Sequence, residues 1–286
     1  MPYIKAPGEP FVADCPYQKL FIYEIQGEFT LPATEAAGDF LGCWREGDCS
    51  YLFFTQKKED HVKKILGERQ AQRYLSETVI NYEDWEAGHP LVPMRIADFY
   101  LCPLWEQPQP GPGEHLIRLD PGVAFGSGFH PTTKLCLQLI HDLYDQADFP
   151  QVLDLGTGTG ILSLACLARG AHQVLAVDHN NLAVTTAAAN ARHNGLAHCI
   201  SLVCGDVLDY LATPADLALA NMYYAILREV MEQERFFNKA WYILSGLVGT
   251  EIDKMLTQMR QTPLEVVQVV DENLWFAILA RNRALT

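Results

Sequence analysis

The fold class follows most directly from the stretch Val152-Leu-Asp-Leu-Gly-Thr-Gly-Thr-Gly-Ile161. A short apolar run, typical of a buried strand, ends in Gly156, Gly158 and Gly160. Because glycine lacks a Cβ, such a turn can adopt positive φ values and lie close to a ligand. The next apolar run ends at Asp178, a position from which a carboxylate can accept hydrogen bonds from ribose hydroxyls. The pattern therefore predicts a strand, a turn and a helix that bind a nucleoside.

The glycine spacing favours S-adenosylmethionine (SAM) over a dinucleotide as that nucleoside. The pyrophosphate fingerprint G-x-G-x-x-G requires a glycine where this chain has Ile161. Asp154 precedes the glycines, and its charge disfavours a pyrophosphate but suits a ligand that carries an ammonium and a sulfonium. The alternative is a glycine-rich turn in another α/β fold, although the strand, turn, helix and second acidic strand together favour the nucleoside site.

Strands and helices alternate along the rest of the chain. The predicted strands cover 152–155, 174–178, 200–204, 216–220 and 240–248, and a closing hairpin is expected over about 264–281. The predicted helices between them cover 160–169, 181–194, 223–236 and 251–261. This alternation is typical of a mostly parallel sheet with helices on both faces. With an antiparallel final pair, the expected fold is a seven-stranded, doubly wound, Rossmann-like α/β sheet.

The chain before this sheet is predicted to form a smaller α+β domain. After a proline-rich irregular arm over 1–18, strand and helix patterns occur at 20–25, 40–55, 57–67 and 78–82. Prolines and glycines between residues 103 and 113 indicate a semi-rigid linker, because proline restricts φ. We therefore expect an N-terminal domain over 1–95, a linker over 96–115 and a catalytic domain over 116–286.

A family resemblance is carried by the segment Leu119-Asp-Pro-Gly-Val-Ala-Phe-Gly-Ser-Gly-Phe-His-Pro-Thr-Thr133. It strongly resembles the LDPGxAFGTGxHPTT signature of the PrmA family, bacterial methyltransferases that modify amino groups of a ribosomal protein. The resemblance is dense over 83–281 and thin before that. It implies a SAM-dependent methyltransferase sheet and, for the N-terminal domain, a ferredoxin-like fold that docks the substrate protein. Further matches in the same order are Glu83-Asp-Trp85, Pro103-Leu-Trp-Glu106, the glycine turn, Ala220-Asn221 and Leu244-Ser-Gly-Leu247.

Two departures from the family pattern make this chain a divergent member. Met222-Tyr223-Tyr224 stands where the family has a small apolar run such as Ile-Leu-Ala. Glu86-Ala-Gly-His-Pro90 replaces a Trp-Lys segment. Both segments are expected to lie on the acceptor side of the site. They therefore affect the assignment of the substrate more than the assignment of methyl transfer.

The residues expected to hold SAM lie at or just after the carboxyl ends of predicted strands, where parallel sheets bind their ligands. We assign Gly156 and its loop to the methionine end, Asp178 to the ribose and Asp206 to the adenine edge. For Asp206 an Asx turn after a strand is the alternative. The resemblance adds Thr133, with its hydroxyl near the carboxylate or the sulfonium. The full set of expected cofactor contacts is Thr133, Asp154, Gly156, Gly158, Gly160, Asp178, Asp206 and Asn221.

Asn221 and Tyr224 are the expected catalytic residues. Asn221-Met-Tyr-Tyr224 resembles the Asn-Pro-Pro-Tyr element of SAM enzymes that methylate amides and exocyclic base amines, in which carbonyl oxygens accept hydrogen bonds from the target amine. The aromatic rings would attract a methylated ammonium by a cation–π interaction. Alternatively, Tyr223 and Tyr224 begin a helix and pack in the core. His130 near the site either relays the proton of the acceptor or caps a helix.

The composition restricts the partners and the location. The formal net charge is −14, which disfavours nucleic acid and favours a basic protein substrate. No leader and no run of 18 apolar residues occurs, so a cytoplasmic protein without a membrane segment is expected. Eight scattered cysteines without C-x-x-C spacing read as reduced core residues, and no metal site is expected. The sequence gives no indication of an oligomeric state.

The preferred function is SAM-dependent N-methylation of lysine or α-amino groups of a basic protein, such as a ribosomal protein. Methyl transfer requires the acceptor lone pair in line with the S–CH₃ bond, and it requires no metal. A second hypothesis is a methyltransferase of the same fold that acts on another amine or amide, including a base or a small molecule. A third is a SAM-binding protein without turnover, which would bind the cofactor but incorporate no methyl groups.

Overall fold

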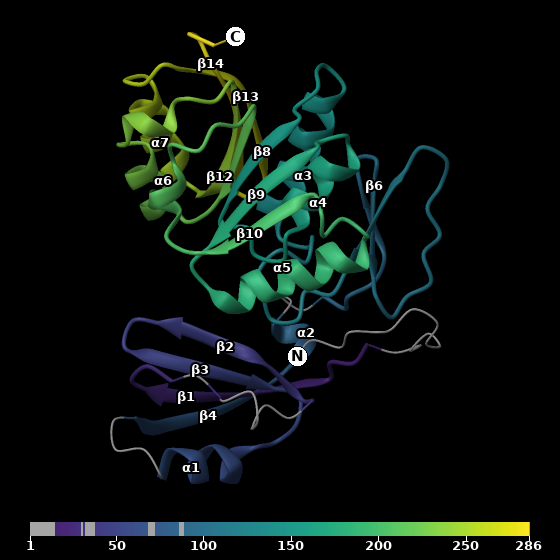
Figure 1. Cartoon of the computed structure of the whole chain (residues 1–286), viewed down its shortest axis with the longest axis vertical. Helices are drawn as coiled ribbons and strands as arrows, with labels where there is room; N and C mark the ends of the chain where they lie inside the picture. Colours follow the sequence, from purple (N-terminus) through teal and green to yellow (C-terminus); the bar gives the residue numbers. More distant parts are fainter. Residues whose placement is uncertain (1–14, 30, 32–37, 68–71, 86–88, 286) are drawn as a thin grey trace.

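The computed structural model describes residues 15–29, 31, 38–67, 72–85 and 89–285 (Figure 1). Most of the expected proline-rich arm, and the first part of the Glu86–Pro90 departure, lie outside these ranges. None of the helices in the described ranges is long and apolar enough to cross a membrane.

The largest element of the fold is a seven-stranded sheet in the order β10-β9-β8-β11-β12-β14-β13. All neighbours are parallel except β14, which runs antiparallel to β12 and to β13. The sheet confirms the predicted α/β class with its antiparallel final pair. Its strands are β8 (Gln151–Leu155), β9 (Gln173–Asp178), β10 (Ile200–Cys204), β11 (Leu217–Asn221), β12 (Trp241–Val248), β13 (Leu264–Glu272) and β14 (Trp275–Asn282).

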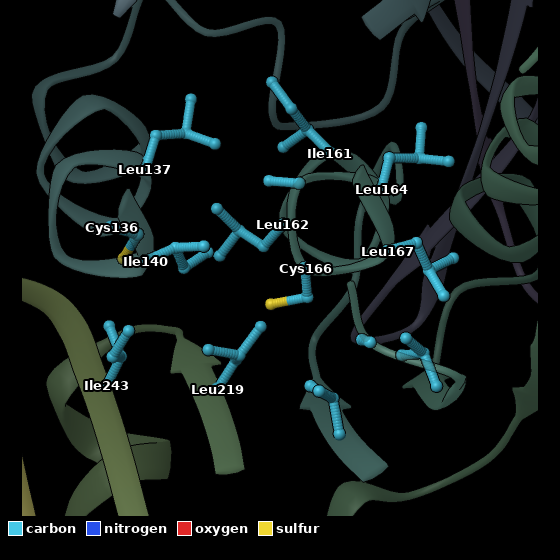
Figure 2. Packing of buried hydrophobic residues seen from close by; sticks show 14 of the residues in the cluster. Cys136, Leu137, Ile140, Ile161, Leu162, Leu164, Cys166, Leu167, Leu219 and Ile243 are labelled. Carbon is cyan, nitrogen blue, oxygen red and sulfur yellow. The ribbon is translucent and has the colours of Figure 1, made fainter. Parts of the chain in front are cut away.

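Helices cover both faces of this sheet, because successive strand residues are buried, largely apolar and point to opposite faces. On one face, α3 (Pro131–Tyr144) and α4 (Ile161–Ala168) pack on Leu219 and Ile243, as Figure 2 shows. On the other face, α6 (Tyr224–Val230) and α7 (Glu251–Met259) pack on the intervening strand residues. At the β10 end, α5 (Asn181–His193) lies between the large sheet and the N-terminal sheet (Figure 1).

The helix expected over 223–236 is shorter in the structure. α6 ends at Val230, and a short 3-10 helix, η2 (Glu234–Phe236), follows a break. The buried Lys239 ammonium donates hydrogen bonds to the carbonyl oxygens of Leu211 and Phe236. The last carbonyls of a helix have no partner within the helix. Lys239 supplies such a partner for Phe236 at the end of η2.

The N-terminal sheet has the order β2-β3-β1-β4 with antiparallel neighbours throughout. α1 covers one face, and the other face packs on α5 and on residues 123–124 (Figure 1). This is an α+β arrangement with the central strand pair expected for a ferredoxin-like sheet. Its elements are β1 (Lys19–Gln26), β2 (Phe40–Glu46), β3 (Cys49–Phe54), α1 (Glu59–Gly67) and β4 (Arg73–Asn81), followed by the short α2 (Tyr82–Trp85).

A third sheet overlaps the segment that was expected to be a linker. It has the order β5-β6-β7, with β5 (Met94–Ile96), β6 (Phe99–Pro103) and β7 (His115–Leu119). Every residue of β6 is buried, and the side chains of Phe99 and Leu101 join the core that includes α3 and α4. The prolines that suggested a linker are confined to the end of β6 and to the loop after it. An apolar run flanked by prolines was therefore a short buried strand.

Candidate cofactor and acceptor site

The glycine turn follows β8 at the carboxyl edge of the large sheet. Gly156, Gly158 and Gly160 have φ values of 74°, 55° and 81°. The Gly156 and Thr157 N–H groups both donate to the Val177 carbonyl, at 2.8 and 3.1 Å, so the turn is bound to the neighbouring strand β9. A Cβ at position 158 would overlap the Phe125 carbonyl oxygen. Left-handed φ values and close approach together explain why glycine is required here.

Asp178 ends β9 beside this turn and is held by two backbone donors. Its Oδ2 accepts from the Gly158 N–H at 3.0 Å, and its Oδ1 accepts from the Asn180 N–H at 2.9 Å. The side chain is 8% exposed. A carboxylate oxygen accepts more than one hydrogen bond, so each oxygen retains capacity for a ligand hydroxyl.

Asp154 lies in β8, just before the same glycine turn, but its environment differs from that of Asp178. Its Oδ2 accepts from the hydroxyls of Thr157 at 2.7 Å and Ser163 at 2.6 Å. The side chain is buried, and this burial raises the pKa of its carboxyl. The contacts tie β8 to the turn and to α4. Asp154 therefore shapes the turn, and its direct contact with the ligand stays a prediction.

The family-signature segment packs directly on the glycine turn. The carbonyls of Phe125 and Gly126 accept from the Thr159 N–H at 2.9 Å and from its hydroxyl at 2.7 Å. Asn190 of α5 joins the two segments: its Oδ1 accepts from the Asp120 N–H at 2.9 Å, and its Nδ2 donates to the Thr159 carbonyl at 3.0 Å. Sequence reasoning missed Thr159 and Asn190. An asparagine on the buried face of an alanine-rich helix was the available signal for Asn190.

Thr133 lies in the first turn of α3 and is buried. Its hydroxyl has no hydrogen-bond partner among the residues that the structure describes. An unsatisfied buried hydroxyl costs stability unless a ligand or water supplies the partner. The hydroxyl therefore fits the SAM contact that the resemblance implied.

His130 caps the same helix. Its Nδ1 accepts from the Thr132 N–H at 3.3 Å and lies 2.8 Å from the Thr132 hydroxyl. Burial, and then the charge of Lys134, lower the pKa of the imidazole. The ring packs edge-on against Phe125 and Trp275, with centroids 5.1 and 4.6 Å away. These contacts match the helix-capping role, which the sequence left open for His130 beside a proton relay.

Asp206 follows β10, the strand next to β9. Its Oδ1 accepts from the Leu208 N–H at 2.9 Å and caps a 3-10 helix, η1 (Val207–Tyr210). The side chain is exposed. This is the Asx turn that the sequence left open as the alternative to an adenine contact.

Asn221 ends β11 and shares the carboxyl edge with the glycine turn, because β11 pairs with β8. The next residue, Met222, donates its N–H to the Ser245 carbonyl at 3.0 Å. The Met222 side chain lies over Gly156, where a Cβ would come within 2.7 Å of its Cγ. The structure therefore brings Asn221, the glycine turn and Asp178 together on three adjacent strands.

Tyr224 packs on the face of a helix, which is one of the two arrangements that the sequence left open. It begins α6, is half-buried and packs against the core on the α6–α7 face of the sheet. The Lys254 ammonium lies 5.8 Å from the centroid of its ring. Tyr223 is 80% exposed. Local sequence could not distinguish an acceptor-facing ring from a helix-face ring. The described contacts of Tyr224 are with the α6–α7 face, and its role at the acceptor stays a prediction.

The strand order reverses between β8 and β11, the position at which doubly wound sheets bind ligands. A glycine turn after the first strand and a carboxylate at the end of the second, on a sheet with this order and an antiparallel β14, define a class I methyltransferase fold. The sequence model of the family described as ribosomal protein L11 methyltransferase (PrmA) matches residues 35–283, and the chain belongs to this family.

Individual relatives agree with the family match. The chain is 32% identical over 242 residues to the ribosomal protein L11 methyltransferase of an Exiguobacterium species, covering 82% of this chain and 76% of that protein. It is 33% identical over 214 residues to the protein of that name from Staphylococcus saprophyticus, covering 73% and 68%. A crystal structure of the ribosomal protein L11 methylase from Lactobacillus delbrueckii superposes with a TM-score of 0.61 at 28% identity, covering 67% of this chain and 98% of that one.

Proposed function

We propose that this protein transfers methyl groups from SAM to lysine or α-amino groups of a basic ribosomal protein, the counterpart of L11. The observation that carries the proposal is the shared edge formed by the glycine turn, Asp178 and Asn221. The family membership supports the protein acceptor. A cytoplasmic location, where ribosomal proteins are made, follows from the proposal.

The cofactor side of the edge suits a nucleoside with a sulfonium. When bound, SAM supplies an electrophilic methyl group. Asp178 is positioned to accept from the ribose hydroxyls, and the unpartnered Thr133 hydroxyl to satisfy a polar group at the methionine end. Asp154 holds the turn between them through Thr157 and Ser163. Asp206 remains a proposed adenine contact, in addition to its capping role.

The acceptor side is organised by Asn221. Its amide oxygen would accept a hydrogen bond from the target amine and orient the nitrogen lone pair toward the methyl group. An ammonium group must lose its proton before it attacks, and partial burial beside a sulfonium lowers its pKa. The amine nitrogen then gains the methyl group, and the thioether leaves as S-adenosylhomocysteine (SAH).

A direct test is methyl incorporation from labelled SAM. We would incubate the purified protein with recombinant L11, and separately with cell extract depleted of L11. Labelling of L11 on lysine or the N-terminus supports the proposal. Labelling confined to a nucleic acid, a small molecule or another protein would favour the second hypothesis, and SAH binding without any labelling would favour a protein that lacks turnover.

The substitution Asn221→Ala separates acceptor alignment from cofactor binding. We expect kcat to fall by about 30- to 1000-fold, because one oriented hydrogen bond in a dry site acts mainly in the transition state. SAH affinity should stay within about twofold. The matched control is Asn238→Ala, since Asn238 donates to the Ala212 carbonyl in an exposed position. Single-turnover rates at saturating SAM would measure the difference, and a wild-type rate for Asn221→Ala would contradict the assigned role.

A further inference from the structure

A buried hydrogen bond joins the N-terminal part of the chain to the family-signature segment. The hydroxyl of Tyr17, just before β1, lies 2.8 and 2.9 Å from the two carboxylate oxygens of Asp120, just after β7. One hydroxyl has one proton, so these distances describe a single bifurcated bond. Both side chains are more than nine-tenths buried. The Tyr17 ring also packs on Tyr82 and Trp105, with centroids 4.7 and 5.9 Å away.

A second N-terminal tyrosine holds the same segment. The Tyr82 hydroxyl donates to the Gly122 carbonyl at 2.5 Å. The Gly122 N–H in turn donates to Asp120 Oδ1 at 3.0 Å. Tyr17 thus contacts the Asp120 carboxylate and Tyr82 contacts Gly122, so the turn over residues 120–122 is bound from the N-terminal side at two points.

The other end of this segment is bound to the glycine turn. Phe125 and Gly126 accept from Thr159, and Asn190 connects Asp120 to Thr159 through both ends of its amide. Thr159 and Asn190 are fully buried. The Phe125 carbonyl also lies against Gly158 so closely that a Cβ there would overlap it. Packed, hydrogen-bonded segments of this kind transmit displacement, because interiors are close-packed.

We propose that Tyr17 and Asp120 are positioning residues through which the docked N-terminal domain holds the glycine turn in its cofactor-binding conformation. This rests on the proposed function, in which that turn binds SAM. Tyr17 lies before residue 35, where the match to the family begins, so this contact comes from the part of the chain outside the match. Coupling is reciprocal, and cofactor binding must therefore favour the docked domain to the same extent.

The substitution Tyr17→Phe removes only the hydroxyl and tests the coupling. We expect SAH affinity, measured by calorimetry, to fall by about 3- to 30-fold, the range of coupling carried by packed networks. The KM for SAM should rise in parallel, while kcat at saturating SAM stays within about twofold. A loss of folding alone would lower the amount of active protein and leave KM unchanged.

The matched control is Tyr23→Phe. Tyr23 is a buried tyrosine of β1 whose hydroxyl donates to Glu77 at 3.1 Å and accepts from the Lys58 N–H at 2.6 Å, on the α1 side of the sheet. It has the same chemistry in the same domain without the link to Asp120. We expect SAH affinity as in the unsubstituted protein, with melting curves showing that both variants are folded.

Hydrogen exchange on the unsubstituted protein tests the reciprocal effect and does not depend on any variant. SAH should slow amide exchange over residues 15–20 and 120–126 and leave α1 unchanged. Equal SAH affinity for the two tyrosine variants, or unchanged exchange over 15–20, would overturn the coupling. An unsubstituted protein that does not bind SAH would instead overturn the proposed cofactor site itself.

Discussion

At the residue scale, two aspartates near the same turn have different roles because their hydrogen-bond donors differ. Asp154 is buried, and its Oδ2 accepts from two internal hydroxyls. Asp178 accepts from two backbone N–H groups at the carboxyl edge of the sheet and is 8% exposed, against 1% for Asp154. We therefore propose that Asp178 binds the ligand while it supports the turn.

We expect Asp178→Ala to weaken SAH binding by about 10- to 100-fold, because a charge-assisted hydrogen bond is lost and ribose hydroxyls stay unpaired. Calorimetric titration measures this directly. Asp148→Ala, in an exposed loop after α3, is the charge-matched control and should bind as the unsubstituted protein does. If the two variants bind SAH equally well, Asp178 does not contact the ribose.

Lys239 predicts a particular pH dependence of stability. Burial lowers the pKa of its ammonium to about 8 from the usual 10.5. Between these values the unfolded chain binds more protons, so the free energy of unfolding should rise with pH from about 8 to about 10.5. Below pH 8 the full cost of burying the charge is present, and stability no longer changes with the titration of Lys239.

Urea unfolding at several pH values measures this rise. Tyrosines ionise in the same range, so the quantity to compare is the difference between the unsubstituted protein and Lys239→Met. In Lys239→Met, the free energy of unfolding should rise less steeply between pH 8 and 10.5, because the lysine contribution is lost. This holds whatever the absolute stability of the variant. Parallel curves for the two proteins would show that Lys239 keeps its usual pKa.

At the element scale, the connection between β8 and α4 depends on close contact as well as on backbone conformation. Gly158 and Gly195 both have left-handed φ values, 55° and 71°. A Cβ at 195 would have open space, whereas one at 158 would overlap the Phe125 carbonyl. Alanine substitutions at these two positions therefore separate two free-energy costs: that of a left-handed backbone conformation and that of steric overlap.

Gly195→Ala should destabilise the protein by about 1–2 kcal/mol, the usual cost of a left-handed residue with a Cβ. Gly158→Ala should cost at least about 1 kcal/mol more, since the overlap forces the signature segment to move, and it should also abolish detectable SAH binding. Denaturant titration and calorimetry on both variants test this pair. Retained SAH affinity in Gly158→Ala would show that the turn tolerates displacement.

At the scale of the whole molecule, the charge of −14 is expected to steer a basic substrate toward the enzyme. The KM for the protein acceptor should therefore rise by about tenfold or more between 50 and 500 mM salt, because exposed charges are screened beyond about 4–14 Å in that range. SAH affinity, set by short-range contacts, should change far less. An acceptor KM that is independent of salt would exclude electrostatic steering.

Much of the catalytic sheet and its glycine turn could be predicted because these features depend on local rules. Alternating apolar runs specify strands and helices wherever they fold, and glycines at positive φ are required by the backbone itself. The same rules placed Asp178 and Asn221 at strand ends, and parallel pairing then brings such ends to one edge. The order of the motifs was sufficient for the family resemblance.

Other features depended on which surfaces meet after the chain has packed. The strand β6 inside an expected linker, the internal hydrogen bonds of Asp154 and the packing of Tyr224 beside α7 each depend on distant partners. The Tyr17–Asp120 bond joins residues 103 positions apart. Local sequence patterns carry no information about such partners, because hydrogen-bond satisfaction and burial are properties of the packed interior rather than of the segment.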